Sequence, residues 1–502
     1  MSIFNFFYLV FAVLNVWNIT CFKSQKILLE LPNLLSIKEN LSVNYISNYM
    51  FGYFDELKYF TLFTLNEWTV LAFGIDSISA ILLLLILLII PLSILYCWNN
   101  ITNKHAAAVY LYILEILLIV AFVTRDLLIF FIVFEVLLWP MYRLIIIWGA
   151  HEQKKRAAMS FVLYTVFGSL ILLITIIILL LTFSTTSIDI FLSYKEYFTF
   201  FNFNHTSNIE NHSQTNSIWW IAFFWVPAFI AFAVKIPTFP FHHWLTLAHV
   251  EAPTAGSIIL AALLLKLGSY GFLRFIFPIF NVILNYIYFM PLIFSMCLLS
   301  IIFAAIMAIS QSDLKRIIAY SSIAHMNFSL LGIFAFSDRA VIGGIILFIA
   351  HGFISAALFF LVGMLYDRYH QRDLLYFRGL STVMPLYSIV YFLTNLANLG
   401  IPLSFNFVGE FLIYIELINL YWVISPLIVF ALIIQIGYTM KLLSILFGNV
   451  IIFNNLIKNK IQWVDLTIVE IFIVIILVVS TYYLGIFGNT FISLISNNYY
   501  FN

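Results

Sequence analysis

Residues 234–241 read Val-Lys-Ile-Pro-Thr-Phe-Pro-Phe and place a lysine and two prolines inside the long apolar segment 219–245. Proline lacks a backbone N–H, and its ring clashes with the preceding turn of a helix. The stretch therefore predicts a broken helix at Pro237 with freed backbone carbonyls. In a membrane such carbonyls are tolerated where they are buried in protein or line a water-filled cavity.

A second break of the same kind lies in residues 399–410, which read Leu-Gly-Ile-Pro-Leu-Ser-Phe-Asn-Phe-Val-Gly-Glu. The apolar segment around it, 383–422, is too long for one crossing helix and is predicted to form two half-helices around Pro402. A charged residue accompanies each break, Lys235 in the first and Glu410 in the second. Paired broken helices point to an ion pathway between inverted repeats, and ordinary proline kinking is the alternative.

Apolar segments of membrane-spanning length recur along nearly the whole chain. Of its 502 residues 64% are apolar and only 9% are charged, and the mean hydropathy is +1.07. Soluble domains carry about 25% charged residues. We predict thirteen spans, at 2–20, 74–98, 106–123, 126–148, 157–182, 219–245, 253–278, 286–310, 314–335, 340–365, 383–422, 424–448 and 463–488. The expected fold class is an all-α polytopic membrane protein with 13–14 transmembrane helices.

These spans divide the chain into five parts. The two central parts, 106–280 and 286–448, each hold five spans with the broken helix fourth. An odd number of spans makes the second repeat inverted relative to the first. The remaining parts are an N-terminal span with a divergent polar region (1–73), a peripheral span (74–105), and a C-terminal span with a tail (449–502).

Basic residues gather in the loops of one face. If spans alternate from residue 74, this face receives eleven lysines and arginines and the opposite face only three, Arg125, Lys195 and Arg339. Loops that remain in the cytoplasm or matrix are enriched in such residues. We call this side the basic face.

Six ionisable residues from six predicted spans are expected near the bilayer midplane. Placing a charge there costs at least ~2.5–3.5 kcal/mol, so such residues are functional candidates. At one depth on different helices they can form a lateral chain, which a proton relay requires. The alternative is that each is a locally paired packing residue. The six are Glu135, Lys235, Lys266, His325, His351 and Glu410.

Further titratable residues are secondary candidates. His242, His243, His249 and Glu251 cluster at the basic-face end of the span 219–245. A metal site is conceivable there, but a role in proton uptake or in capping the half-helix is the preferred interpretation. Glu115, deep in the span 106–123, either extends the relay or pairs with a neighbouring basic residue.

Several kinds of chemistry are disfavoured. The three cysteines, Cys21, Cys97 and Cys297, are scattered, which argues against a cysteine-ligated cluster in this chain. No Gly-rich phosphate loop or dinucleotide fingerprint is present. The net charge of +1 argues against nucleic acid as a partner. We expect no cofactor and no metal in this chain, and no redox chemistry of its own.

Residues 231–271, around the first break, closely resemble the chain 4 family of NADH:ubiquinone oxidoreductase (respiratory complex I). The resemblance extends to residues 311–326, 351–368 and 406–410, and residues 134–142 match the family's first key glutamate. It covers roughly residues 74–450. It implies an antiporter-like fold with two inverted five-helix repeats.

The resemblance also implies a subunit of proton-translocating NADH:ubiquinone reductase, with protons moved by electron transfer in other subunits. Glu135 and Lys235 would form the ion pair of the first half-channel. Lys266 and His325 would link the halves, and His351 and Glu410 would complete the second. Flavin, iron–sulfur clusters and ubiquinone are expected in partner subunits. Expected partners are the antiporter-like chains 2 and 5, other membrane subunits, accessory subunits and lipids.

One departure concerns the N-terminal region. The family has fourteen helices, and its second should lie within residues 21–73, which are polar here. The abundance of Phe (54) and Tyr (28), whose codons are AT-rich, fits an organelle genome and hence the mitochondrial inner membrane. Two alternatives remain: a cation/proton antiporter subunit with no redox partner, and a structural membrane scaffold that has lost pumping.

Overall fold

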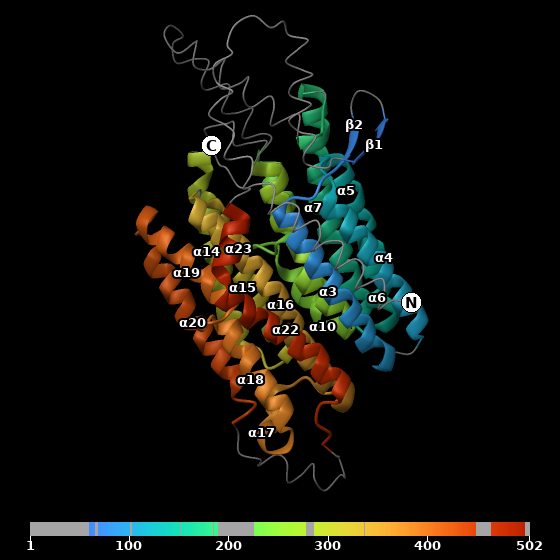
Figure 1. Ribbon diagram of the computed structural model, residues 1–502, viewed down its shortest axis with the longest axis vertical. Helices are drawn as coiled ribbons and strands as arrows, with labels where there is room; N and C mark the ends of the chain where they lie inside the picture. The colour runs from blue at the N-terminus through green and yellow to red at the C-terminus, as the bar shows by residue number, and fades with distance from the viewer. Residues whose placement is uncertain are drawn as a thin grey trace, which may run out of the picture.

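The computed structural model describes residues 60–65, 69–100, 103–150, 152–183, 185–188, 225–277, 286–335, 337–447 and 463–496. These residues form a bundle of long helices that run in roughly the same direction, with one short β-hairpin at its edge (Figure 1). The expected class of an all-α membrane protein is confirmed. The hairpin is an addition that the hydropathy pattern did not indicate.

The described elements have the following bounds. The strands are β1 (Phe60–Leu65) and β2 (Thr69–Phe73), paired antiparallel. The helices of the first half are α3 (Ser77–Asn100), α4 (Lys104–Val123), α5 (Leu127–Val136), α6 (Leu138–Trp148), α7 (Lys154–Phe183), α10 (His243–Glu251), α11 (Thr254–Ile259), η2 (Leu260–Leu264), α12 (Leu265–Gly271) and η3 (Phe272–Ile276). Those of the second half are α14 (Tyr286–Ser310), α15 (Leu314–Phe334), α16 (Asp338–Tyr369), η4 (Leu374–Phe377), α17 (Leu380–Val383), α18 (Pro385–Leu399), α19 (Phe405–Leu420), α20 (Ser425–Leu443), α22 (Ile468–Ile486) and α23 (Gly488–Ser496). A further short apolar helix spans Trp225–Lys235.

Ten helices in the described part are long and apolar enough to cross a membrane. They correspond to ten predicted spans, and the two predicted broken spans are the helix pairs around Pro237 and Pro402. The predicted span 2–20 lies outside the described residues, as do most of the loop 183–218 and most of the stretch 21–73. Within the stretch 21–73, the structure describes only the two strands of the hairpin. The expected inverted relation of the two repeats stays a prediction.

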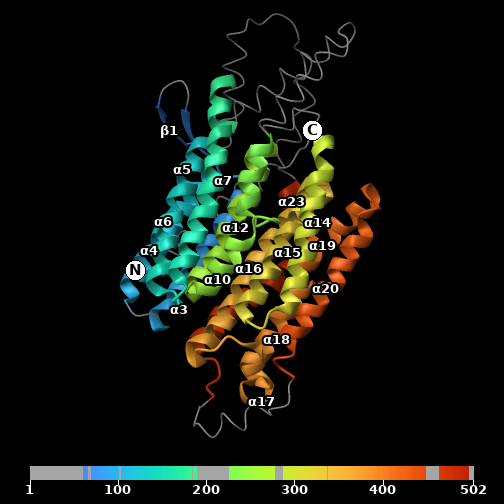
Figure 2. The ribbon, with the colours of Figure 1, turned by 180° about the vertical axis from the view of Figure 1, so that it is seen from behind.

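The centre of the bundle is where the two halves meet. Helices α4 to α7 lie on one side and α18 to α20 on the opposite side, in both views (Figures 1 and 2). Between them run α15, α16 and the continuous span Thr254–Ile276, whose most apolar windows are completely buried. A helix buried on all sides contacts only protein, so its polar side chains need protein or water partners.

The first break is held by side chains that bind the carbonyls around Pro237. Because Pro237 has no N–H, the carbonyl of Ala233 accepts instead from the backbone N–H and the hydroxyl of Thr238, both at 3.1 Å. Trp244 Nε1 donates to Val234 O at 2.9 Å. From α15, Asn327 Nδ2 donates to Pro237 O at 3.3 Å. The break is thus a fixed feature of the fold.

After this break the helix resumes as α10 and continues to Glu251, beyond the predicted end of the span at residue 245. Two buried cations explain the extension. Arg372 Nη1 donates to Val250 O at 2.6 Å, and Lys315 Nζ donates to Ala252 O at 3.0 Å. Cations at a helix C-terminus satisfy its last carbonyls and oppose its dipole.

The second break confirms the prediction of two half-helices. Helix α18 ends at Leu399, and Gly400 has a left-handed φ of 75° that favours glycine. Helix α19 begins at Phe405, where Ser404 Oγ accepts from Phe407 N at 3.3 Å. The side chain of Glu410, on the first turns of α19, lies against Gly400.

Candidate functional site

Lys266 lies in a helix whose hydrogen-bond register changes just before it. In the π-helical turn η2, Leu265 N–H donates to Leu260 O, five residues back. The Lys266 ammonium turns back to this turn and donates to Ala261 O at 2.8 Å. Such π turns are frequent at functional sites. The side chain is completely buried at 0% exposure.

The same ammonium contacts the second half of the protein. Lys266 Nζ lies 2.9 Å from Nδ1 of His351 on α16. The next residue, Gly352, permits this approach, because an added Cβ would lie 2.9 Å from Leu85 Cδ2 and 3.3 Å from Ala262 O. A direct contact between ionisable groups therefore crosses from the first half to the second.

From His351 the series continues through α15 to α19. The rings of His351 and His325 lie 5.9 Å apart between centroids. His325 Nδ1 lies 3.4 Å from Glu410 Oε1, and His325 Nε2 lies 3.4 Å from the hydroxyl of Tyr438 on α20. A hydroxyl can donate to or accept from a ring nitrogen, so Tyr438 remains a partner for His325 in either tautomer.

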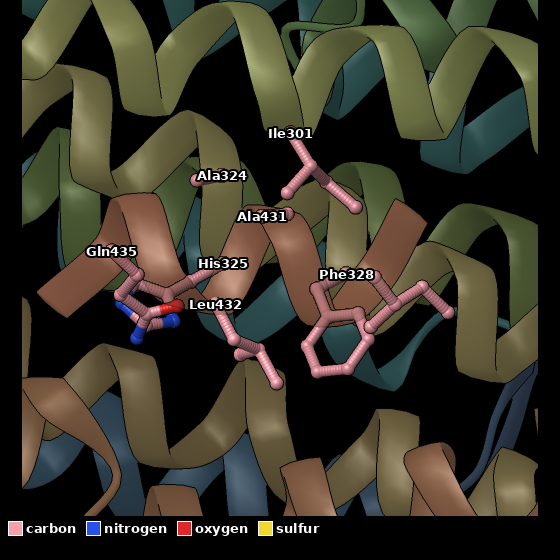
Figure 3. A pocket seen from close by; sticks show the side chains of 8 residues that line it. Ile301, Ala324, His325, Phe328, Ala431, Leu432 and Gln435 are labelled. Carbon is pink, nitrogen blue, oxygen red and sulfur yellow. The ribbon is translucent and has the colours of Figure 1, made fainter. Parts of the chain in front are cut away.

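A small cavity adjoins His325 between α14, α15 and α20. Its volume is about 10 Å³, close to the room that one water molecule needs. His325 and Gln435 lie together at one end of it and Phe328 at the other (Figure 3). Gln435 Nε2 donates to Asn398 O at 3.2 Å. The cavity is therefore lined by polar groups beside His325 and by apolar side chains elsewhere.

Glu135 and Lys235 lie in the first half but do not touch. No ion pair within 4.0 Å joins them among the described residues. Instead Lys235 Nζ lies 4.0 Å from the ring centroid of Phe134, a cation–π contact. Lys235 Nζ and Glu135 Oε1 are buried without hydrogen-bond partners in the described part. The carboxylate still acts electrostatically on the ammonium.

The predicted histidine cluster is spread along α10, with His242 and His243 at its start and His249 in its last turn. His243 is exposed, and His242 is half-buried against the rings of Phe239 and Phe303. His249 is fully buried and stacks on Phe359 with ring centroids 4.6 Å apart. No group of three or more metal-ligating side chains occurs in the parts of the chain that the structure describes.

Four of the six predicted residues therefore form a connected series in the order Lys266, His351, His325, Glu410. This order differs from the one that the resemblance implied, because His351 lies between Lys266 and His325. Glu135 and Lys235 form a separate, non-contacting pair. Glu251 is buried at the end of α10, and its Oε2 has no hydrogen-bond partner in the described part of the chain. Glu115 is half-buried in the middle of α4, with no ion pair among the residues described.

Sequence reasoning missed Tyr438 and Gln435. Both are polar residues inside the predicted span 424–448, and they are spaced by three residues, which puts them on one face of a helix. That spacing is the signal that would have found them.

Comparisons with known proteins agree on one family. The model of the family described as NADH:quinone oxidoreductase/Mrp antiporter, TM, matches residues 124–435. NADH-ubiquinone oxidoreductase chain 4 of Chondrus crispus is 39% identical over 422 residues, which are 84% of this chain and 80% of that one. The same-named protein of Prototheca wickerhamii is 44% identical over 347 residues, 68% of this chain and 62% of that one.

Solved structures show the same fold. A chain of respiratory complex I from Thermus thermophilus with bound NADH superposes with a TM-score of 0.73 at 26% identity, covering 86% of both chains. A chain of the Mrp complex from Dietzia sp. DQ12-45-1b superposes with a TM-score of 0.70 at 18% identity, covering 90% of this chain and 88% of that one. The second likeness concerns the fold alone.

Proposed function

Because the chain belongs to the NADH:quinone oxidoreductase/Mrp antiporter family of membrane subunits, and within it to the chain 4 relatives, we propose that it is a membrane-arm subunit of NADH:ubiquinone oxidoreductase. It translocates protons along its buried Glu, Lys and His residues and draws the energy from electron transfer in other subunits. The contact series from Lys266 to Glu410 is the observation that carries this proposal.

The spacing of the series couples the charges of its members. Two positive charges 2.9 Å apart, as Lys266 and His351 would be if both were protonated, repel by roughly 6 kcal/mol at an effective dielectric constant of about 20. Moving one charge across 100 mV costs about 2.3 kcal/mol. A proton arriving on Lys266 therefore drives one off His351, toward His325 and Glu410.

Glu135 and Lys235 act as the adjustable part of the row. In the present arrangement Lys235 is held by the Phe134 ring, without a direct carboxylate partner. An approach of Glu135 would hold the proton on Lys235, and a separation would release it toward Lys266, since burial disfavours the charged amine. Electron transfer elsewhere in the complex would set this separation.

The same proposal covers location and partners. The chain lies in the mitochondrial inner membrane, is organelle-encoded, and packs against the antiporter-like chains 2 and 5. Flavin, iron–sulfur clusters and ubiquinone reside in partner subunits. A cation/proton antiporter subunit would instead purify without flavin and iron–sulfur proteins, so co-purification separates these two functions.

The relay is tested by Lys266→Met and Glu410→Gln in the assembled complex, in sealed vesicles, with protons counted per electron. Both variants keep the side-chain size and remove the charge. We expect the ratio to fall in both. Lys441→Met is the matched control, because Lys441 donates to the carbonyls of Ile309 in α14 and of Gln311 just beyond it, and lies outside the series. An unchanged ratio in Lys266→Met and Glu410→Gln would overturn the relay assignment.

A further inference from the structure

Helix α18 has its polar side inside the protein and its apolar side outside. Leu386, Ile389 and Phe392 are 48%, 58% and 36% exposed and would face lipid. Polar side chains inside a membrane face the bundle interior or water, and they often mark ion paths. The buried face of α18 carries Tyr387, Ser388, Tyr391, Thr394, Asn395 and Asn398.

Two asparagines near the end of this face have unpartnered polar atoms. Asn398 is 2% exposed and its Nδ2 has no hydrogen-bond partner in the described part of the chain. Asn406, at the start of α19, is 0% exposed, and neither its Nδ2 nor its Oδ1 has a partner there. A buried polar group that lacks a hydrogen bond destabilises the folded protein. Native proteins satisfy buried polar groups with protein atoms or ordered water, so these amides point to bound water.

The polar face has a charged group at each end. At its inner end, Gly400 follows the last residue of α18, and the Glu410 carboxylate lies against it. At its outer end, Asp465 accepts from the backbone N–H groups of Leu386 and Tyr387 at 2.9 and 3.1 Å. This end adjoins the loop 366–380, which the charge pattern assigns to the basic face.

The polar side chains between these ends follow one buried face of α18. Asn395 Nδ2 donates to the backbone carbonyl of Tyr391 at 2.8 Å, while Tyr391 Oη and Asn395 Oδ1 have no hydrogen-bond partner in the described part of the chain. The rings of Tyr387 and Tyr391 stack with centroids 5.6 Å apart. Tyr387 and Asn398 are eleven residues apart on the helix, about 16 Å along its axis. The face thus runs from the basic side to the depth of Glu410.

We propose that the buried polar face of α18 is a hydrated proton pathway that links the basic face to Glu410. Water molecules bound by the Asn398 and Asn406 amides pass the proton along, each accepting one proton and releasing another. The Glu410 carboxylate is the point where this pathway meets the relay. This inference rests on the proposed function, because it joins the Glu410 end of the same relay to the basic face.

The hydration of α18 is tested on the unmodified complex by radiolytic hydroxyl labelling, which reports water next to buried side chains. Tyr391 should label well above Tyr270, an equally buried tyrosine whose hydroxyl donates to Phe122 O at 2.8 Å inside an aromatic cluster. Equal labelling of the two tyrosines would mean a dry face and would overturn the proposal, and this measurement needs no variant to fold.

Conduction is tested by Asn398→Leu, which keeps the side-chain size and removes the amide. We expect fewer protons per electron in sealed vesicles. The control is Thr481→Val on α22, which removes a buried hydroxyl that donates to Val478 O within the same helix. If Lys266→Met and Glu410→Gln lower the ratio while Asn398→Leu matches Thr481→Val, the pathway is refuted and the relay stands. If those two charge variants leave the ratio unchanged, the relay itself fails.

Discussion

Gly400→Ala tests how closely the second helix break and the end of the relay depend on each other. Gly400 has a φ of 75°, and a Cβ added there would clash with Glu410 Oε2. The left-handed backbone alone costs alanine about 1–2 kcal/mol. The clash comes in addition, and the flexible carboxylate is the group that can move.

The distances in the structure give the size of the functional effect. Glu410 Oε1 lies 3.4 Å from His325 Nδ1, already longer than a good charge-assisted hydrogen bond of about 2.7–2.9 Å. A displacement of roughly 1 Å, the kind of misplacement that can cost an active site about 10²-fold, would separate the pair. We therefore expect Gly400→Ala to lower both the stability of the complex and the number of protons moved per electron.

The assay combines thermal unfolding of the purified complex with proton counting in sealed vesicles. Gly379→Ala is the matched control, because Gly379 has a similar φ of 84° but lies at the N-terminus of α17. The Gly379→Ala variant should lose about as much stability as Gly400→Ala does from its backbone strain. Its number of protons moved per electron should equal that of the unmodified complex. If both variants kept the ratio of the unmodified complex, the contact between Gly400 and Glu410 would have no functional role.

Two further predictions concern the surroundings of the relay. Tyr438→Phe removes a hydroxyl that lies 3.4 Å from His325 Nε2. Losing about 0.5–1 kcal/mol of hydrogen-bond free energy should slow coupled turnover roughly two- to fivefold. Tyr270→Phe is the control, and equal turnover rates in the two variants would contradict a role for Tyr438. Asp465→Ala removes the carboxylate that accepts from two backbone N–H groups at the start of α18. We expect thermal unfolding to show a loss of about 1 kcal/mol of stability. An unchanged unfolding temperature would show that water satisfies these N–H groups in its place.

Local features of the chain determined the membrane class, the spans and both breaks. Hydropathy acts residue by residue, and proline removes a backbone N–H without any tertiary contact. Proline alone does not mark a break, because Pro91 and Pro291 lie inside the continuous helices α3 and α14. The charged residue that accompanies each break, Lys235 or Glu410, was the additional signal in the sequence. The prediction of six ionisable residues deep in their helices also needed no tertiary information, because depth follows from position along a helix. The polar face of α18 is also visible in the sequence, because its polar residues recur every three to four positions.

The order of the relay was decided only by the tertiary structure. Depth fixes one coordinate, while lateral order depends on how each helix is rotated and which helix packs beside it. The packing of α16 against the π turn puts His351, rather than His325, next to Lys266. It also leaves Lys235 on the Phe134 ring instead of on Glu135. The sequence by itself determined which charges stand inside apolar helices of membrane-spanning length or beside a helix break, because both follow from position along the chain, and the packing of the helices decided which of these charges touch.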